Sequence, residues 1–252
     1  MGLFKVCTFF YIKISEKFMK VTLLIPTLNE IEGMKQIMPR IKREWVDQII
    51  ILDGNSTDGT VEYAKNQGCD VVTQRRKGLR QGYMEVMKHI VGDIVITFSP
   101  DGNSVPELIP PLIEKMKKGY NMVIVSRYAK GAKSYDDDAI TAFGNWMFTF
   151  LINFLFGARY TDAMVMFRAW RKEIIYNLEI NKEVKFPFWE DIVGVWVSWE
   201  PQLSIRCAKR KLRCAEIPGD EPKRIYGERK MRPFITGSAV LFQVIQELFF
   251  WR

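Results

Sequence analysis

The chain has 252 residues, of which 48% are hydrophobic and 26% are charged, and this ordinary globular balance excludes a disordered or fibrous protein. Its formal charge of +8 favours anionic partners, namely nucleic acid, phosphorylated ligands or an acidic membrane surface. The four Cys have no Cys-x-x-Cys spacing, which argues against a zinc or redox motif, and His89 is the single His. We therefore expect catalysis to depend on carboxylates, cations and a bound metal.

The first half of the chain alternates between apolar runs and helical patterns. We expect strands at 21–25, 48–52, 70–73, 94–98 and 122–125, with helices at 30–43, 57–66, 78–90 and 106–117. Apolar strands that alternate with helices predict a mostly parallel α/β sheet with right-handed crossovers. After residue 128 we expect an apolar helix, a short strand near 163–167, a helix after Trp170, a basic loop and an amphipathic tail.

Polar, turn-forming residues follow four of the predicted strands. They occupy positions 26–30, 53–60, 99–103 and 126–128. In open α/β sheets, ligands bind beyond the carboxyl ends of the strands. Polar loops are common, but Asp53 and Asp101 each follow a separate strand and Arg127 follows a third. This pattern predicts a shared site at one edge of the sheet.

Two apolar segments and the N-terminus bear on membrane insertion. Residues 140–158 approach the length of a membrane span, but polar residues recur every four positions and form a stripe typical of an amphipathic helix: Thr141, Asn145, Thr149 and Asn153. Residues 240–251 are also apolar, with polar residues on one side. Residues 1–15 lack a long apolar core and a small-residue cleavage site. We expect no removed leader and no full span, and amphipathic helices that lie half in the core or on a membrane.

The positive charge is concentrated near the C-terminus. Between Arg206 and Arg232 the chain has ten Lys or Arg and four Asp or Glu, which accounts for six of the eight net positive charges. Pro218-Gly219 and Tyr226-Gly227 interrupt this stretch, and such pairs favour a loop over a helix. We interpret it as a phosphate-handling loop. Nucleic-acid binding is not indicated, because the interleaved aromatic residues and base-reading motifs of that class are missing from the sequence.

The ordered set of motifs resembles the family-two inverting glycosyltransferases of GT-A fold, and more closely the polyprenyl-phosphate sugar transferases of the dolichyl-phosphate mannose synthase type. The matching pieces are IPTLNE (25–30), DGNSTDGT (53–60), KGLRQG (77–82), SPDGNSVPE (99–107), SRY (126–128), FRAWRKE (167–173) and GERKM (227–231). The resemblance implies a GT-A, Rossmann-like, mostly parallel sheet flanked by helices, with C-terminal amphipathic helices. Residues 1–128 would form the nucleotide-sugar-binding half and 129–252 the acceptor-side half of a single domain.

The resemblance also implies a nucleotide diphosphate-sugar donor. Asp53 would accept hydrogen bonds from the base or a ribose hydroxyl, or else bond the backbone of its own turn. Glu30 would line the pocket or favour a helix N-terminus, and Asp58 would cap a helix. The basic residues around Gly78, including Arg75 and Arg76, would face the diphosphate or form a solvated cluster. The donor-binding set is Pro26, Leu28, Glu30, Asp53, Asn55, Lys77, Arg80, Gly102, Arg224 and Lys230.

Asp101 is the candidate metal ligand and a candidate catalytic residue. The family usually places Asp-x-Asp after the fourth strand, whereas this chain has Ser99 in the first position. Either Asp101 alone holds Mg²⁺ or Mn²⁺ with the donor phosphates, or metal dependence is weaker. The cation would neutralise the leaving diphosphate.

The acceptor implied by the resemblance is a lipid-linked phosphate. Its candidate ligands are Arg127, Lys133, Arg224, Arg229 and Lys230, since Arg pairs two phosphate oxygens at once. An ionised phosphate needs no strong general base. A hydroxyl acceptor needs one, and Asp191 of the Glu190-Asp191 pair is the candidate, although the pair also fits a helix N-terminus. We give the acidic run 136–138 no role beyond helix charge.

The predicted function is transfer of a sugar from a nucleotide diphosphate-sugar to a polyprenyl phosphate with inversion. The expected location is cytoplasmic, peripheral on the cytoplasmic face of a membrane. One alternative is a glycosyltransferase that acts on a saccharide or protein hydroxyl. The other is a binding protein for nucleotide-sugars or anionic lipids that has lost catalysis. The reason to consider it is Ser99, which stands where the family usually has an acid.

Overall fold

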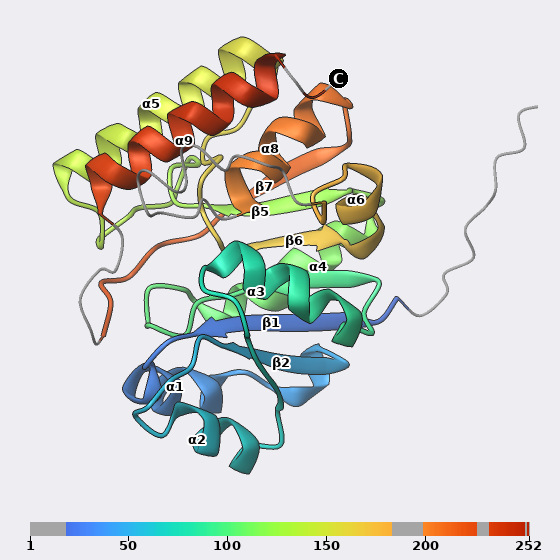
Figure 1. Ribbon diagram of the computed structural model, residues 1–252, viewed down its shortest axis with the longest axis vertical. Coiled ribbons are helices and arrows are strands. Elements are labelled where there is room, and N and C mark those ends of the chain that lie inside the picture. The colour runs from blue at the N-terminus through green and yellow to red at the C-terminus, as the bar shows by residue number, and fades with distance from the viewer. Residues whose placement is uncertain (1–18, 183–198, 226–231, 250, 252) are drawn as a thin grey trace, which may run out of the picture.

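The structure is a computed structural model that describes residues 19–182, 199–225, 232–249 and 251. A central seven-stranded sheet has the order β3-β2-β1-β4-β6-β5-β7 (Figure 1). Its strands are β1 (Val21–Thr27), β2 (Gln48–Asp53), β3 (Asp70–Thr73), β4 (Ile94–Thr97), β5 (Met122–Ser126), β6 (Arg168–Arg171) and β7 (Cys214–Pro218). Strand β6 runs antiparallel to its neighbours β4 and β5, and the other pairs are parallel. Both halves of the chain thus contribute to one sheet.

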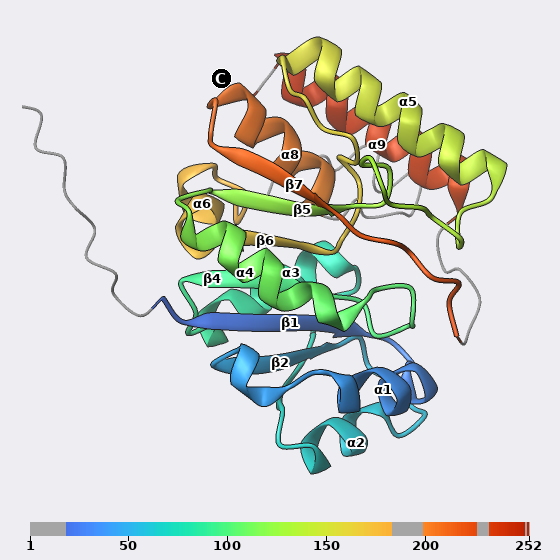
Figure 2. The ribbon, with the colours of Figure 1, turned by 180° about the vertical axis from the view of Figure 1, so that it is seen from behind.

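Helices cover both faces of the sheet. They are α1 (Ile31–Ile37), α2 (Thr60–Asn66), α3 (Leu79–Val86), α4 (Ile109–Lys117), α5 (Ala139–Phe156), α6 (Lys172–Asn177), α8 (Trp199–Lys209) and α9 (Pro233–Phe249). Alternate side chains of β1 point to opposite faces. Leu23 packs with α1, α2 and α4 on one face, whereas Leu24 belongs to the core beneath α3, α6 and α8 on the other. Figure 2 shows α4 and α1 from behind.

Helices α5 and α9 lie side by side at one end of the molecule, beyond β7 (Figures 1 and 2). Gly237 of α9 faces the ring of Phe148 in α5, and a Cβ added there would lie 3.7 Å from it. Asp138 caps α5 by accepting a hydrogen bond from the Thr141 amide (2.8 Å), and Gly157 ends the helix in a left-handed conformation. The acidic run therefore lies at the N-terminus of a helix, as expected, and its last residue also caps that helix.

Two predictions about the second half are wrong. The strand lies at Arg168–Arg171 rather than at 163–167, because the buried Arg168 guanidinium takes the carbonyls of Ala163 (3.1 Å) and Val165 and so removes them from strand pairing. The basic stretch is not one loop: it contains the end of α8 and strand β7. Strand β7 lies at the sheet edge and is only partly buried, so its sequence has no continuous apolar run.

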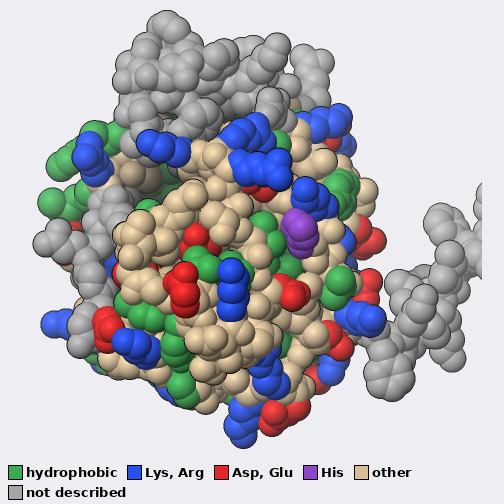
Figure 3. Space-filling model, turned by 60° about the horizontal axis from the view of Figure 1, so that its bottom comes forward, with side chains coloured by type: hydrophobic (Ala, Val, Ile, Leu, Met, Phe, Trp, Pro, Cys, Tyr) green, Lys and Arg blue, Asp and Glu red, His purple; other side chains and the backbone are tan. Residues whose placement is uncertain are grey.

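Charged side chains are mixed over the lower end of the molecule. Figure 3 shows Lys and Arg interspersed with Asp and Glu there, and the single His at the surface. His89 is exposed, and its backbone carbonyl accepts a hydrogen bond from Gln48 Nε2 (3.1 Å). The net positive charge of the chain therefore does not produce one uniform basic patch on this face.

Candidate active site

The loops after β1 and β2 are held against each other by side-chain hydrogen bonds. The Asn29 amide donates to Ser56 Oγ (2.9 Å), and the Thr57 amide donates to Asn29 Oδ1 (2.8 Å). The amide of Ile31, at the start of α1, donates to Asp58 Oδ2 (3.0 Å). Asp58 therefore caps a helix, as expected, and it also ties the two loops together.

Asp58 gives a testable pH dependence. Its partial burial raises its pKa, but bonds from Thr60 and the Ile31 amide outweigh this, so the pKa lies below the ordinary value. A lowered folded-state pKa gives stability that is present above the unfolded pKa and lost as pH falls through the folded one. We predict that Asp58→Ala is less stable than wild type at pH 7 and that the difference shrinks below about pH 4. Urea unfolding at several pH values checks this, and a pH-independent difference would contradict it.

Asp53 organises the turn that follows β2. It is buried, and its carboxylate accepts hydrogen bonds from the amides of Asn55 (2.9 Å) and Ser56 (3.2 Å). Asn55 adopts a left-handed φ of 71° and donates from its side chain to the Gln74 carbonyl (3.0 Å). The structure thus shows the turn role of Asp53, and its contact with a nucleotide stays a prediction.

The other residues near the end of β1 that we predicted to bind the sugar donor lie at the same edge of the sheet. Pro26 pairs with Leu52 near the end of β1. Leu28 is exposed and covers Gly54, whose added Cβ would lie 3.4 Å from Leu28. Glu30 directly precedes α1, and its amide donates to Thr60 Oγ1 (3.1 Å). These positions leave an exposed apolar side chain beside the Asp53 turn.

The basic cluster after β3 is divided among different environments. Arg80 was expected to face the donor diphosphate, but it is buried and donates to Gln202 Oε1 of α8 (2.7 Å). Arg76 pairs with Glu85 (3.5 Å), whereas Lys77 is exposed. The prediction for Arg80 is corrected: its position in the first turns of α3 aims the long side chain into the core, where α8 supplies an acceptor.

Asp101 lies in the loop after β4 and is buried. Its Oδ1 accepts from the Asn103 amide (3.3 Å), and its Oδ2 forms an ion pair with Arg224 (3.3 Å). Gly102 has a φ of 91°, and an added Cβ would lie 2.4 Å from Ile225, so only glycine fits here. Asp101, Gly102 and Arg224 were predicted separately, and the fold brings them together.

Asp101 fits a divalent cation as a single carboxylate. Within the described ranges, the structure has no cluster of three or more His, Cys, Asp or Glu side chains suited to a metal. Mg²⁺ commonly uses one or two carboxylates together with substrate phosphates. A guanidinium already lies against Asp101 Oδ2, which shows that this position accepts positive charge. Asp101 would therefore hold the cation jointly with the donor.

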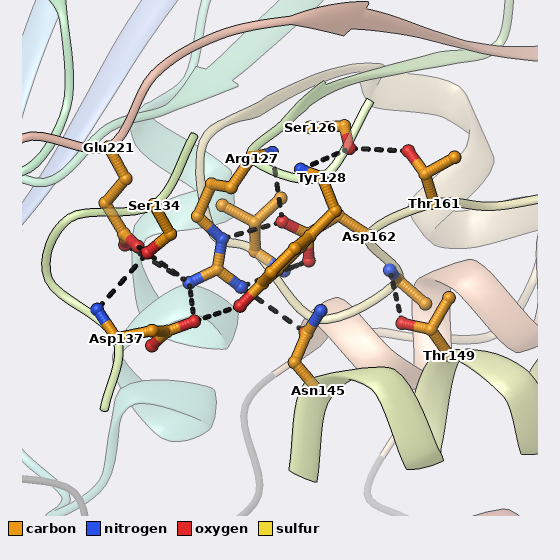
Figure 4. Close-up of polar contacts among 12 residues, drawn as sticks. Ser126, Arg127, Tyr128, Ser134, Asp137, Asn145, Thr149, Thr161, Asp162 and Glu221 are labelled. Carbon is orange, nitrogen blue, oxygen red and sulfur yellow. Dashed lines mark hydrogen bonds and ion pairs between the residues drawn. The ribbon is translucent and has the colours of Figure 1, made fainter. Parts of the chain in front are cut away.

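Arg127 lies at the centre of a polar cluster at the end of β5 (Figure 4). Its Nε and Nη2 donate to the Asp162 carboxylate (2.7 and 3.1 Å), its Nη1 donates to Glu221 (3.2 Å), and Asp137 adds an ion pair (3.5 Å). Burial disfavours the charged guanidinium, but these three carboxylates outweigh it and raise the pKa of Arg127. A phosphate can therefore reach Arg127 only in exchange for a carboxylate.

Each residue of the acidic run 136–138 has a different partner. Asp136 pairs with Arg224 (3.6 Å), Asp137 pairs with Arg127, and Asp138 caps α5. Our assignment of helix charge alone is corrected for the first two. Asp162 and Glu221 were not singled out from the sequence, because nothing near them in the chain signals that they converge on Arg127 in space.

Several predicted residues lie elsewhere. Lys133 is exposed, and its amide donates to Asp220 Oδ1 (2.8 Å). Asp191, Glu190, Arg229 and Lys230 lie outside the described residues. Arg206, part of the basic stretch, is buried and ion-paired to Glu247 of α9 (2.7 Å), so it contributes to packing rather than to a phosphate-binding face.

The sequence profile of glycosyl transferase family 2 matches residues 22–178. The chain belongs to this family. A dolichyl-phosphate hexose transferase of Haloferax volcanii is 27% identical over 222 residues, covering 87% of this chain and 90% of that protein. An undecaprenyl-phosphate mannosyltransferase of Micrococcus luteus is 24% identical over 242 residues, covering 88% and 92%.

Solved structures confirm the fold of this family-two glycosyltransferase. Glucosyl-3-phosphoglycerate synthase from Mycobacterium tuberculosis, in complex with Mn²⁺, UDP and phosphoglyceric acid, has a TM-score of 0.63. It is 20% identical, and the match covers 92% of this chain and 78% of that one. The same synthase is also known with Mg²⁺ and UDP. The expected α/β architecture of GT-A type is thus confirmed, and the family match confirms the expected enzyme class.

The glycosyltransferase carries two helices whose polar sides face inward. In α5, Asn145 reaches Arg127 (3.3 Å) and Thr149 Oγ1 accepts from the Ala163 amide (3.1 Å). The opposite side exposes a ladder of aromatic side chains: Phe143, Trp146, Phe150 and Phe154. In α9, Gln243 and Glu247 are buried, and the exposed side chains include Phe234, Leu241, Ile245, Leu248 and Phe249.

An ordinary surface helix buries its apolar side. Helices α5 and α9 instead bury polar side chains together with apolar ones such as Phe148 and Val244, and expose a mostly apolar side. By length and composition, α5 alone among the described helices could cross a membrane, and 28% of it is buried in the protein. The polar side chains of α5 form hydrogen bonds within the protein. The two exposed apolar sides, which we call the α5/α9 surface, lie on adjacent helices, and clustered exposed apolar side chains mark interaction sites.

Proposed function

We propose that this glycosyltransferase moves a sugar from a nucleotide diphosphate-sugar to a polyprenyl phosphate at a membrane surface. The observation that carries the proposal is the α5/α9 surface beside a site that contains Arg127 and Asp101. The α5 cap, Asp138, directly follows the two acids that contact Arg127 and Arg224. A lipid embedded under α5 and α9 can therefore present its phosphate at the ends of the strands. The similarity to transferases that act on dolichyl and undecaprenyl phosphates supports the same acceptor class.

The chemistry requires no strong general base. The ionised phosphate oxygen attacks the anomeric carbon from the side opposite the nucleotide. The bond from that carbon to the donor diphosphate breaks, and the diphosphate leaves with the electron pair, which inverts the anomeric centre. A Mg²⁺ or Mn²⁺ ion held at Asp101 would supply charge neutralisation for the leaving diphosphate. Arg127 would hold the attacking phosphate through Nη1, while Nε and Nη2 stay on Asp162.

The test is transfer from a panel of radiolabelled nucleotide-sugars to polyprenyl phosphate, measured as label in the organic phase. We expect label with at least one donor, and none when the matching polyprenol replaces the phosphate. Transfer to neither acceptor by the folded protein would sink the proposal. A hydroxyl acceptor remains the competing assignment, and it predicts that Asp191→Asn abolishes transfer, whereas a phosphate acceptor predicts that this variant keeps it.

We further propose that the protein is peripheral on the cytoplasmic face of the membrane. The described Cys69, Cys207 and Cys214 are free thiols, which is typical of cytosolic proteins. The aromatic ladder of α5 would lie in the interfacial region, where aromatic rings are favoured. In this arrangement α5 stays packed against α9 and does not cross the bilayer.

Membrane attachment can be measured with vesicles. We predict that the double variant Trp146→Ser, Phe150→Ser lowers partitioning onto anionic vesicles by about tenfold or more, since burying a large apolar side chain contributes about 1.5–3 kcal/mol. Both side chains are exposed, so folding should be little affected. Tyr176→Ser is the matched control, because Tyr176 is an exposed aromatic residue on α6, outside the α5/α9 surface. Equal losses in the two variants would contradict the assignment of this surface.

A further inference from the structure

Two segments that are distant in sequence meet over the site. Residues 133–137 precede α5, and residues 220–225 follow β7; together we call them the ribbon. The Glu221 amide donates to the Lys133 carbonyl (2.9 Å), and the Tyr135 amide donates to the Glu221 carbonyl (2.8 Å). The Arg224 amide donates to Asp136 Oδ1 (3.1 Å). These bonds make the two segments one unit.

The ribbon places opposite charges on both functional groups. Its Arg224 guanidinium lies against the Asp101 carboxylate (3.3 Å), where the site would hold a divalent cation. Its Glu221 carboxylate lies on Nη1 of Arg127 (3.2 Å), where the site would hold a phosphate. Asp137, from the other ribbon segment, lies on the same nitrogen (3.5 Å). The ribbon therefore places a positive charge where the site would bind the cation and a negative charge where it would bind the phosphate.

The two contacts are mechanically linked. Glu221 and Arg224 lie on the same short segment. That segment is anchored at its far end, where the Ile225 amide donates to the Asp101 carbonyl (2.9 Å) and the Ile225 side chain occupies the space beside Gly102. Arg224 and Ile225 thus attach the segment that carries Glu221 to the loop of Asp101.

We propose that the ribbon is an autoinhibitory plug that couples the two ligand positions. A cation at Asp101 displaces Arg224, shifts the ribbon as one unit, and withdraws both Glu221 and Asp137 from Arg127, which opens Nη1 to the acceptor phosphate. The proposal rests on the proposed function in one respect, that Arg127 receives a phosphate. Cation and phosphate then strengthen each other's binding, because coupling between two sites is reciprocal. The site is thus kept closed to lipid phosphate until the cation is in place.

The test is calorimetric titration of the whole protein with MnCl₂ alone and with farnesyl phosphate alone. Each titration is then repeated in the presence of the other ligand. In the wild type, saturating Mn²⁺ should tighten farnesyl phosphate binding by about tenfold. Direct attraction between Mn²⁺ and phosphate also produces coupling, so the variant Arg224→Gln decides. The plug predicts that Arg224→Gln tightens metal-free farnesyl phosphate binding by about threefold or more, although it removes a positive charge. Simple electrostatics predicts weaker binding.

Lys223→Gln is the matched control. Lys223 is the exposed neighbour of Arg224, and the variant loses the same charge without touching Asp101. It should not tighten metal-free binding. Amide hydrogen exchange gives a second readout: Mn²⁺ should speed exchange at Ile225, whose bond to the Asp101 carbonyl opens. Weaker binding in both variants, or exchange unchanged by Mn²⁺, overturns the plug.

These readouts separate the plug from the proposed function. Coupled binding without sugar transfer to polyprenyl phosphate would support the plug and count against the function. Sugar transfer without coupling, and with Arg224→Gln binding farnesyl phosphate no more tightly than wild type, would overturn the plug and leave the function standing.

Discussion

Glu247→Gln is expected to lower the free energy of unfolding by about 3–5 kcal/mol, because it leaves a buried guanidinium without its counter-charge. Glu247 and Arg206 are almost completely buried, with side-chain exposures of 1% and 4%. Arg206 Nε and Nη2 donate to the Glu247 carboxylate (2.9 and 2.7 Å), and Gln202 Nε2 donates to the same group (2.7 Å). Urea unfolding followed by circular dichroism measures the change.

The loss should be specific to the buried pair. Glu179→Gln removes a carboxylate from an exposed pair with Lys182, and such pairs contribute about 0–1 kcal/mol. The double variant Arg206→Met, Glu247→Leu should recover part of the stability, since an apolar pair of similar volume removes the uncompensated charge. A loss below about 1 kcal/mol in Glu247→Gln would show that the remaining acceptors around Arg206, such as the Leu178 carbonyl (2.7 Å), suffice.

This pair explains why the polar side of α9 is buried. Gln202 links the pair to Arg80, so a single network joins α3, α8 and α9. The network holds α9 by its polar side and leaves its apolar side outward. If Glu247→Gln remains folded, it should therefore also weaken vesicle binding, because α9 loses its ion pair with α8.

The sequence predicted the first half well because its signals are local. The strands at 21–25, 48–52, 70–73, 94–98 and 122–125 are all found, with ends that differ by at most two residues. Each is a short apolar run followed by turn residues, and each belongs to a core with helices on both faces. The polar ends of these strands accordingly lie at one edge, as the rule for parallel sheets requires.

The partners of the site's charged residues could not be predicted in the same way. Arg80 looks like a phosphate ligand in sequence, but whether it reaches Gln202 depends on α8, which lies 122 residues away in the chain. Arg127 meets Asp162 and Glu221, which are 35 and 94 residues away. Helix α5 was recognised as amphipathic, yet only the fold shows that its polar side faces inward.

Asp162→Asn is expected to lower kcat/KM for the polyprenyl phosphate by about 100-fold, because Arg127 loses the group that orients it. Asp162 is completely buried, and its carboxylate receives Nε, Nη2 and the backbone amide of Arg127 (2.7, 3.1 and 3.3 Å). The amides of Asp162 and Thr161 in turn donate to Glu216 (3.1 and 2.9 Å), which fixes the position of the carboxylate. Steady-state transfer rates with each substrate varied separately measure the loss.

A positioning role for Asp162 predicts an asymmetric effect. The KM for the acceptor should rise and the KM for the donor should stay near the wild-type value, because Asp53 and Asp101 lie on other loops. Asp162→Glu, which keeps the charge, should recover part of the activity, whereas a loss due to unfolding would lower donor binding as well. Glu107→Gln is the control of equal charge change, since it breaks only the exposed pair with Arg40. Equal increases in KM for both substrates would show that Asp162 supports the fold rather than the orientation of Arg127.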